Sequence, residues 1–290
     1  MIVNPNAGKK QGLTASEEAA RNFKEQGIEY EIMVSKVPGD SINLASSLNI
    51  SNFDGILAVG GDGTLFEVIN GLFKNKEELH IPIGQIPVGT GNSFIKDLGI
   101  STREDALNKI LSGQTREIDL GEFSYSSGKY YFANLLGTGF VSNVAYRAKK
   151  YKKLGSLSYV FGVLEEVTVL KAAKIELNID GKIIKREAVF TEICNSRFTG
   201  GDMMMAPDAK IDDGLLDVII LNKVSRRKLL SLFPSLFKGE HVKDDTVEVF
   251  KGRNISLKSD HPLALTPDGE TFGETPIEVK IHPKKIKMFC

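Results

Sequence analysis

Carboxylates stand in three glycine-containing stretches of the chain, and each stretch could serve phosphate or metal chemistry. They are Gly60-Gly61-Asp62-Gly63-Thr64, the acidic loop Ala206–Leu215, and Asp268-Gly269-Glu270. Glycines let a backbone approach a ligand closely. Carboxylate oxygens beside them are ligands that Mg²⁺ accepts. These stretches are therefore the first candidates for a functional site.

The loop around Asp62 lies between a predicted strand and a predicted helix. The apolar run Gly55–Val59 precedes it. Apolar residues then recur at the spacing of one helical face, at Leu65, Val68, Ile69 and Leu72. A helix N-terminus at this loop would offer free N–H groups and the positive end of the helix dipole to a phosphate. The alternative is a tight turn in which Asp62 only caps the helix.

The same strand, glycine loop and helix pattern occurs twice more in the first half of the chain. Ile83–Val88 runs into Gly89–Ser93, and Ile2-Val3 runs into Asn4–Lys10, whose spacing is not that of a P-loop. Loops that follow adjacent parallel strands meet at one edge of a sheet, where open α/β sheets bind ligands. Strands and helices alternate over residues 1–115, which predicts a doubly wound α/β domain.

From Ile118 the pattern becomes rich in strands. Two helices, at about Val141–Leu170 and Ser225–Lys238, interrupt it, and Asp180-Gly181 is a hairpin signal. Strands are predicted at 118–121, 130–136, 173–179, 183–195, 215–221, 247–249 and 255–258. The second half is therefore expected to be antiparallel.

The other polar segments leave alternatives open. The acidic loop Ala206–Leu215 could hold a hard cation, but it lacks the spacing of an EF-hand and could be a solvated turn. Glu270 could be a general base if the fold returns it to the first domain, and Pro267-Asp268-Gly269 is also an ordinary turn sequence. The helix Ser225–Lys238 begins with basic residues and could dock on anionic lipid or face a core.

Composition excludes several classes of protein. Lys plus Arg and Asp plus Glu both number 37 among 290 residues, so no global charge favours nucleic acid. No apolar stretch is long enough to span a bilayer. Met1–Pro5 enters a predicted strand directly, so no secretory signal is expected. The two cysteines, Cys194 and Cys290, fit a reducing cytoplasm, and the four dispersed histidines support neither zinc nor a serine triad.

The motifs taken together resemble the diacylglycerol kinase catalytic-domain family, in its bacterial soluble lipid kinase branch, which is similar to sphingosine and ceramide kinases. The resemblance covers essentially the whole chain, whereas the glycine-aspartate loop alone is shared with NAD kinases. The motifs stand in one order, namely Asn4–Gly8, Gly60–Gly71, Pro87–Asn92, Ala206–Asp217 and Asp268–Glu270.

The resemblance implies a two-domain α/β fold. An N-terminal doubly wound nucleotide-binding domain over residues 1–117 would be completed by residues 277–290. A C-terminal antiparallel β-sandwich with inserted helices over residues 118–276 would bind the lipid. The implied activity is transfer of the γ-phosphate of ATP to a hydroxyl of diacylglycerol or a similar lipid with Mg²⁺, as a step in phospholipid biosynthesis.

The resemblance also assigns site residues. Glu270 matches the proton acceptor, Asp62 would lie by the Mg²⁺-ATP phosphates, and Asp119 would order the active-site network. A structural magnesium site would use Lys210 and Leu215 through main-chain oxygens and Asp213 through its side chain. ATP contacts are implied at Asn4, Pro5, Asn6, Ala7, Gly8, Ser35 (where the family usually has Thr), Gly60, Gly61, Asp62, Gly63, Thr64, Leu65, Phe66 and Thr90.

One residue departs from the family pattern, and the acceptor is left open. Ser93 stands where the family commonly has Asp, which removes a carboxylate near the reaction centre. The partners expected are a lipid substrate and transient peripheral contact of a cytoplasmic protein with the membrane, with no nucleic acid and with a homodimer left open. The alternatives are a kinase of a sphingoid base, a ceramide or a soluble acceptor, or a nucleotide-binding regulator without catalysis.

Overall fold

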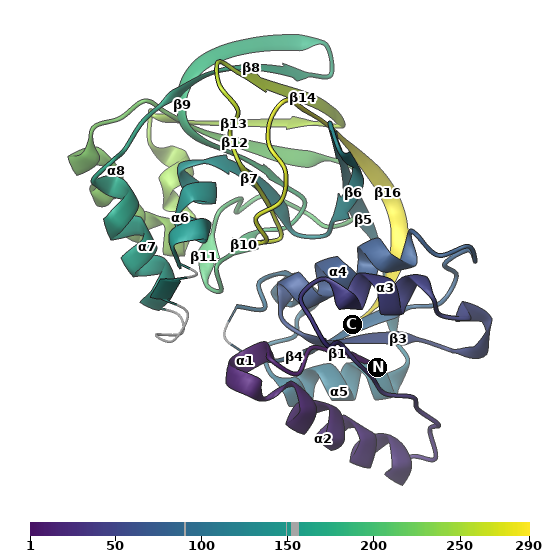
Figure 1. Ribbon diagram of the computed structural model, residues 1–290. Coiled ribbons are helices and arrows are strands. Elements are labelled where there is room, and N and C mark those ends of the chain that lie inside the picture. Colours follow the sequence, from purple (N-terminus) through teal and green to yellow (C-terminus); the bar gives the residue numbers. More distant parts are fainter. Residues whose placement is uncertain (90, 149, 152–156) are drawn as a thin grey trace. The chain divides into compact units, whose positions relative to one another are not determined.

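A computed structural model describes residues 1–89, 91–148, 150–151 and 157–290. The chain divides into two compact units, and Figure 1 shows the elements of each. The first unit comprises Met1–Ile118 and Lys284–Cys290, and the second comprises Asp119–Pro283. The chain passes between the units within two strands, β5 (Thr115–Tyr125) and β16 (Ile277–Phe289).

The first unit contains a parallel sheet in the order β2-β1-β3-β4, with the C-terminal end of β16 beside β4. Its strands are β1 (Ile2–Val3), β2 (Met33–Val34), β3 (Ile56–Gly60) and β4 (Ile83–Pro87). Every residue of β1, β3 and β4 is buried, as expected for strands covered on both faces. The alternating residues Glu29–Ser35 predict a strand, but only Met33 and Val34 pair with β1.

Helices surround this sheet. They are α1 (Ala7–Lys10), α2 (Gly12–Glu25), α3 (Asp40–Ser46), η1 (Ile50–Asn52), α4 (Asp62–Leu72), η2 (Phe94–Leu98) and α5 (Arg103–Ser112). The sequence Thr14-Ala15-Ser16-Glu17 predicts a capping box at a helix start, which is wrong because α2 already begins at Gly12. Thr102 does cap α5, and it forms a capping box with Asp105.

The second unit is built on an antiparallel sheet in the order β13-β12-β9-β8-β14, which ends on the first residues of β16. The long strand β9 pairs with β8 through its first half and with β7 through its second half. Asp180 and Gly181 both have positive φ and form the predicted hairpin between β8 and β9. The strands are β6 (Gly128–Phe132), β7 (Leu135–Gly139), β8 (Ala173–Ile179), β9 (Lys182–Cys194), β10 (Phe198–Thr199), β11 (Met203–Met204), β12 (Leu216–Asn222), β13 (Val247–Gly252), β14 (Asn254–Ser259) and β15 (Leu265–Pro267).

These two units confirm the predicted fold class, an α/β protein with a parallel N-terminal part and an antiparallel C-terminal part. The helix predicted over Val141–Leu170 is in fact two helices, α6 (Phe140–Ala148) and α7 (Leu157–Val167). The helix predicted over Ser225–Lys238 is α8 (Arg226–Leu232), which continues as the 3₁₀ helix η4 (Phe233–Lys238) where Pro234 lacks an N–H. A second 3₁₀ helix, η5 (Glu240–Lys243), follows. Within the described ranges, every helix is too short or too polar to traverse a bilayer.

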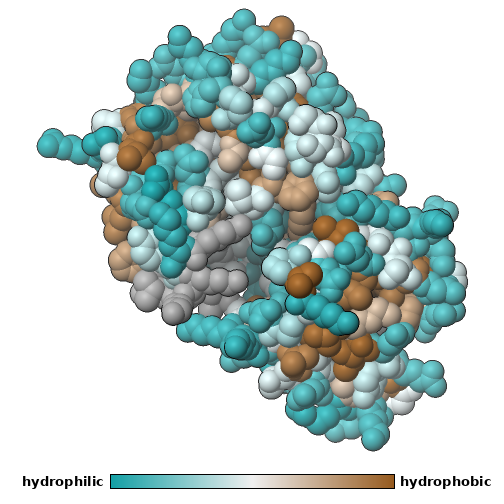
Figure 2. Space-filling view, viewed as in Figure 1, coloured by the Kyte–Doolittle hydropathy of each residue, from teal (hydrophilic) through white to brown (hydrophobic). Residues whose placement is uncertain are grey.

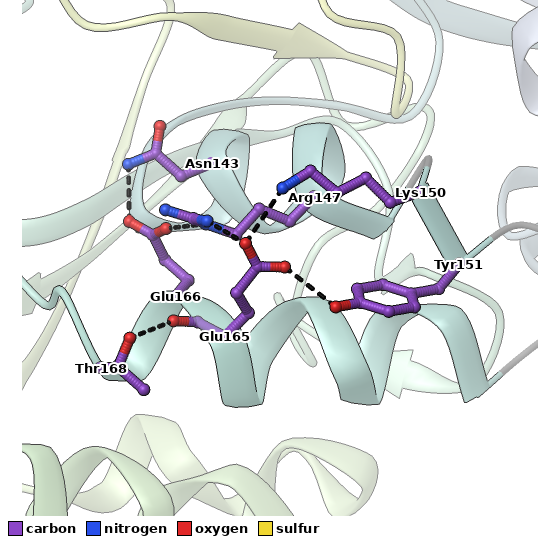
Figure 3. Close-up of polar contacts among 7 residues, drawn as sticks. All are labelled: Asn143, Arg147, Lys150, Tyr151, Glu165, Glu166 and Thr168. Atoms are coloured by element: carbon purple, nitrogen blue, oxygen red, sulfur yellow. Dashed lines mark hydrogen bonds and ion pairs between the residues drawn. The ribbon is translucent and has the colours of Figure 1, made fainter.

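A cluster of polar side chains holds α6 against α7 (Figure 3). Arg147 on α6 forms ion pairs with both Glu165 and Glu166 on α7. Glu166 also accepts a hydrogen bond from Asn143 at 2.8 Å, and Glu165 accepts one from the Tyr151 hydroxyl at 3.1 Å. The Glu166 side chain is only 6% exposed, so its ion pair with Arg147 and its hydrogen bond from Asn143 offset the loss of contact with water.

Candidate active site

The loops that follow β1, β3 and β4 come together at one edge of the parallel sheet. Asn4 Nδ2 donates a hydrogen bond to Thr64 Oγ1 at 3.3 Å, which joins the first loop to the start of α4. Gly8, with a φ of +52°, lies so close to the third loop that a Cβ would stand 2.7 Å from Val88 Cγ1 and 2.8 Å from the Gly89 nitrogen. Only glycine fits there. The convergence expected for the loops after β3 and β4 is present, and the loop after β1 joins them.

Asp62 is the first residue of α4, and its carboxylate joins this helix to η2. Asp62 Oδ2 accepts a hydrogen bond from the Ser93 N–H at 2.8 Å, and Oδ1 accepts one from the Phe94 N–H at 3.4 Å. Burial raises the pKa of Asp62, and the bonds from Ser93 and Phe94 and the charge of Lys96 oppose that rise. The loops that follow β3 and β4 thus share a carboxylate in a partly desolvated position.

Two amide side chains support these loops, and the sequence patterns did not single them out. Gln85, buried in β4, donates to the Gly60 carbonyl at 3.2 Å and to Asn92 Oδ1 at 3.5 Å. Asn92 in turn donates to the Gly89 carbonyl at 3.0 Å. A polar residue inside the otherwise apolar strand Ile83–Val88 was the signal for Gln85.

The other residues implied in nucleotide contacts occupy varied surroundings. Asn6 donates its N–H to Asn4 Oδ1 at 3.0 Å, which shapes the loop after β1. Ser35 follows β2, is buried, and donates its N–H to the Val3 carbonyl at 2.9 Å. Leu65 and Phe66 are buried in the core. Thr90 lies outside the described residues.

In the second unit, Asp119 is fully buried and holds the acidic loop in place. Asp119 Oδ2 accepts a hydrogen bond from the Gly214 N–H at 2.6 Å, and the Asp119 N–H donates to the Ile211 carbonyl at 2.7 Å. On the same loop, Asp213 Oδ1 accepts from the Leu215 N–H at 3.0 Å. Asp119 therefore lies against the segment of the predicted magnesium ligands.

The magnesium site expected at Lys210, Asp213 and Leu215 stays a prediction. Within the part of the chain that the structure describes, no group of three or more His, Cys, Asp and Glu side chains could hold a metal. The predicted set would need only one carboxylate, from Asp213, because Lys210 and Leu215 would contribute main-chain oxygens. Such hard oxygen donors are of the kind that Mg²⁺ prefers.

Asp268 fixes the turn that carries Glu270. Its carboxylate accepts three hydrogen bonds, from the N–H groups of Ala133 at 3.0 Å, Asn134 at 2.9 Å and Leu135 at 3.1 Å. Asp268 and Gly269 both have positive φ, and the Glu270 N–H donates to the Pro267 carbonyl at 2.8 Å. Asp268 is buried, so a residue that the sequence offered only as part of a turn has a structural role.

A buried amide connects the Asp268 turn with Asp119. Asn195 donates from Nδ2 to the Ala133 carbonyl at 2.8 Å and to the Asp119 carbonyl at 3.1 Å. Ala133 also donates its N–H to Asp268. The Asn195 side chain therefore joins Asp119 of β5 to the residues that hold the Asp268 turn. Two of the predicted catalytic residues, Asp119 and Glu270, are thus tied to one hydrogen-bond network within the second unit.

An apolar cavity of about 90 Å³ lies in the second unit. Phe140 and Val144 of α6, Val163 of α7 and Leu229 of α8 form much of its wall, and Gly269, next to Glu270, also lines it. Two titratable side chains, Glu192 and His241, face this otherwise apolar space. Sequence reasoning missed Glu192, although a lone charge in the apolar run Val189–Cys194 was a signal.

Comparison with known proteins gives matches over nearly the whole chain. Residues 1–123 match the model of the diacylglycerol kinase catalytic domain, and residues 134–290 match that of the YegS C-terminal NAD kinase beta sandwich-like domain. A diacylglycerol kinase of Bacillus subtilis (strain 168) is 31% identical over 285 residues, covering 96% of this chain and 91% of the relative. One of Staphylococcus aureus (strain MRSA252) is 30% identical over 293 residues, covering 100% and 91%.

Solved structures share the fold. A crystal structure of a diacylglycerol kinase from Bacillus anthracis (strain Sterne) superposes with a TM-score of 0.81 at 24% identity, covering 99% of this chain and 95% of that one. An NAD kinase from Archaeoglobus fulgidus in complex with ATP superposes with a TM-score of 0.54 at 14% identity, covering 100% and 92%. These likenesses show that the chain shares its fold with both proteins.

Proposed function

Because the chain belongs to the diacylglycerol kinase catalytic-domain family and is a lipid kinase, we propose that it transfers the γ-phosphate of ATP to a hydroxyl group of diacylglycerol or a similar lipid with Mg²⁺. The observation that carries the proposal is the convergence of three glycine loops on the N-terminus of α4 in the first unit. The shared fold with a solved NAD kinase that holds ATP supports the choice of nucleotide.

The first unit is proposed to bind the donor. The main-chain N–H groups of the loops at Asn4–Gly8 and Gly60–Thr64, together with the dipole of α4, suit the phosphates of ATP. A carboxylate has about four acceptor positions, so the two N–H bonds and the Ser93 hydroxyl bond that Asp62 receives leave an oxygen lone pair for a cation. Mg²⁺ bound with ATP would neutralise charge on the transferred phosphoryl group.

The second unit is proposed to supply the base and to bind the acceptor. Glu270 accepts the proton of the lipid hydroxyl, and the turn anchored by Asp268 sets its position. Asp119 acts as a positioning residue through the hydrogen bonds that it shares with Asn195 and Gly214. Lys210, Asp213 and Leu215 are proposed to hold a second, structural Mg²⁺ on the loop that Asp119 anchors.

We propose that the protein meets its lipid by transient contact with a membrane surface. Large apolar side chains are exposed along the helices of the second unit, among them Tyr146 at 63%, Leu164 at 50% and Phe237 at 46%. Arg226 and Arg227 are exposed at the start of α8 and could contact anionic headgroups. Figure 2 shows brown atoms along the outer edge of this unit, where Figure 1 places α7 and α8. Exposed apolar surface beside basic residues is typical of proteins that dock on lipid.

Phosphotransfer from γ-labelled ATP tests the proposal. Diacylglycerol, a sphingoid base, ceramide and phosphatidylglycerol would be offered in mixed micelles, with NAD and glycerol as soluble acceptors. We expect label in a lipid product that forms only when Mg²⁺ is present. Label in a soluble acceptor with none in any lipid would contradict the proposal. ATP binding without transfer to any acceptor would instead identify a regulator without catalysis.

A further inference from the structure

The apolar cavity of the second unit contains a buried carboxyl group that the proposed reaction does not use. Glu192 lies in β9 at the cavity wall and is 2% exposed. Among the described residues, its Oε2 has no hydrogen-bond partner. Burial raises the pKa of Glu192 to about 8, and no hydrogen bond or ion pair opposes this rise. A pKa of about 8 favours the neutral form of Glu192 at pH 7, and within the described ranges Oε2 is left without a hydrogen-bond partner.

The strand beside Glu192 leaves room for this carboxyl group. Gly137 of β7 lies opposite Glu192 in the β7–β9 register. A Cβ at Gly137 would stand 2.7 Å from Glu192 Oε2, so a larger residue would displace the carboxyl. An unsatisfied buried polar group costs on the order of 1–3 kcal/mol. A ligand that supplies the missing hydrogen-bond partner of Glu192 would remove this cost on binding.

His241 is a second polar group on the same cavity. Its Nε2 lies 3.0 Å from the Met205 carbonyl, so Nε2 carries the hydrogen of the neutral ring and Nδ1 is an acceptor. Nδ1 has no partner in the part of the chain that the structure describes. Burial lowers the pKa of His241, which keeps the ring neutral. The two neutral polar groups suit an uncharged polar group carried by an apolar ligand.

We propose that the cavity binds the carbonyl end of an acyl chain of the acceptor lipid and that Glu192 donates a hydrogen bond to the carbonyl oxygen of that chain. This inference rests on the proposed lipid substrate. An ester or amide carbonyl is an uncharged acceptor attached directly to an apolar chain, and it matches the free O–H of a neutral carboxyl group. Gly269 lines the same cavity and is followed by Glu270, so a chain bound there would lie against the turn that carries the proposed base.

Direct binding measurements test this without any phosphotransfer. Isothermal calorimetry in the absence of ATP would compare dioctanoylglycerol, which has ester carbonyls, with its dioctyl ether analogue, which has none. We expect the wild-type protein to bind the ester about tenfold more tightly, as one good hydrogen bond supplies. Glu192→Met should bind both lipids alike. Glu192→Gln should keep part of the preference, because its amide N–H can donate. Gly137→Ala, which displaces the carboxyl, should lose the preference.

Matched controls make each outcome decisive. Glu187→Gln changes an exposed carboxylate of the same strand and should leave the ester preference unchanged. Glu192→Met should unfold at no lower temperature than wild type at pH 7.5, because it removes a buried polar group. Equal binding of ester and ether by wild type, or an unchanged preference in Glu192→Met, would overturn the inference. An ester preference that depends on Glu192 in a protein that phosphorylates no lipid would sustain the inference and refute the proposed function.

Discussion

The main-chain N–H of Ser93 donates a hydrogen bond to Asp62 Oδ2 at 2.8 Å. The Ser93 hydroxyl also forms a hydrogen bond that lowers the pKa of Asp62. The resembling family commonly has Asp at position 93, where a second carboxylate would stand beside Asp62. Because the main chain supplies the 2.8 Å contact, the link between α4 and η2 does not depend on the side chain at this position. With Ser93 at this position, Asp62 is the carboxylate that the N–H groups of Ser93 and Phe94 hold beside the glycine loops.

Replacement of Gly8 by alanine should weaken ATP binding. The new Cβ would stand within 2.8 Å of Val88 Cγ1 and of the Gly89 nitrogen, so the first and third loops would move apart. We expect a dissociation constant for ATP that is about tenfold higher. Gly27→Ala is the matched control, because Gly27 also has positive φ but has no atom within 4 Å of its Cβ position. Calorimetric titration with a non-hydrolysable ATP analogue measures both. Equal affinity of the two variants would refute close approach of the loops.

Replacement of Asp268 by alanine should destabilise the second unit and lower turnover. Three buried N–H groups, of Ala133, Asn134 and Leu135, would lose their acceptor. We expect the free energy of unfolding to fall by about 3 kcal/mol, and kcat to fall because Glu270 follows the turn. Asp245→Ala, at an exposed position, should be neutral in both measurements. Urea unfolding measures the stability and steady-state kinetics measure kcat. An Asp268→Ala protein as stable as Asp245→Ala would contradict the role of Asp268 in holding the turn.

The two acidic residues of α7 should differ in their effect on stability. Glu166→Gln leaves Arg147 without its most buried partner and should reduce the free energy of unfolding by about 2 kcal/mol. Glu165 is 28% exposed, so Glu165→Gln should reduce the free energy of unfolding much less than Glu166→Gln does. Thermal and chemical unfolding of the two variants make the comparison. A larger loss of stability in Glu165→Gln than in Glu166→Gln would contradict this arrangement of α6 and α7.

Stability should depend on pH through Glu192. Its pKa is about 8 in the folded protein, against an ordinary value of 4.5, so the folded state retains a proton that the unfolded state has lost. The contribution is fully present below the unfolded pKa and disappears as pH rises through the folded pKa. The stability of wild type relative to Glu192→Gln should therefore fall by about 1.4 kcal/mol per pH unit in that window, and then level off.

The titratable groups near Glu192 are the same in wild type and in Glu192→Gln, so their contributions to the pH dependence cancel in the difference between the two proteins. Burial raises the pKa of Cys194 and of Asp217, and lowers that of His241. Unfolding curves collected across the window measure the difference directly. A difference that stays constant with pH would show that Glu192 is ionised in the folded protein and would remove the neutral donor that the cavity inference requires.

The first unit could be predicted largely from local pattern. Gly60–Thr64 and Gly89–Ser93 each follow a short apolar run, and strand periodicity with glycine loops is a property of neighbouring residues. The parallel order of β1, β3 and β4 then places the loops together. Gln85 was missed because its partners, Gly60 and Asn92, are set by the fold rather than by spacing.

The second unit shows what a sequence does not reveal. Burial raises the pKa of Glu192, and that burial follows from a strand pairing that places it opposite Gly137, 55 residues earlier. Asp268 is an anchor because its acceptor oxygens meet N–H groups more than 130 residues away. Such roles depend on long-range pairing, which residue type and local spacing do not encode. The break between α6 and α7 was hidden for a related reason, since Val141–Leu170 is apolar enough to suggest one helix.

The most direct test of the central claim compares wild type with Asp62→Ala in transfer of γ-labelled phosphate from ATP to diacylglycerol in mixed micelles. Circular dichroism would first confirm that the variant is folded, and Asp54→Ala, at an exposed position of the same unit, is the matched control. We predict labelled phosphatidic acid from wild type and from Asp54→Ala, and a loss of at least a thousandfold in kcat for Asp62→Ala, on the order of 4 kcal/mol. Full activity of a folded Asp62→Ala protein would contradict the account.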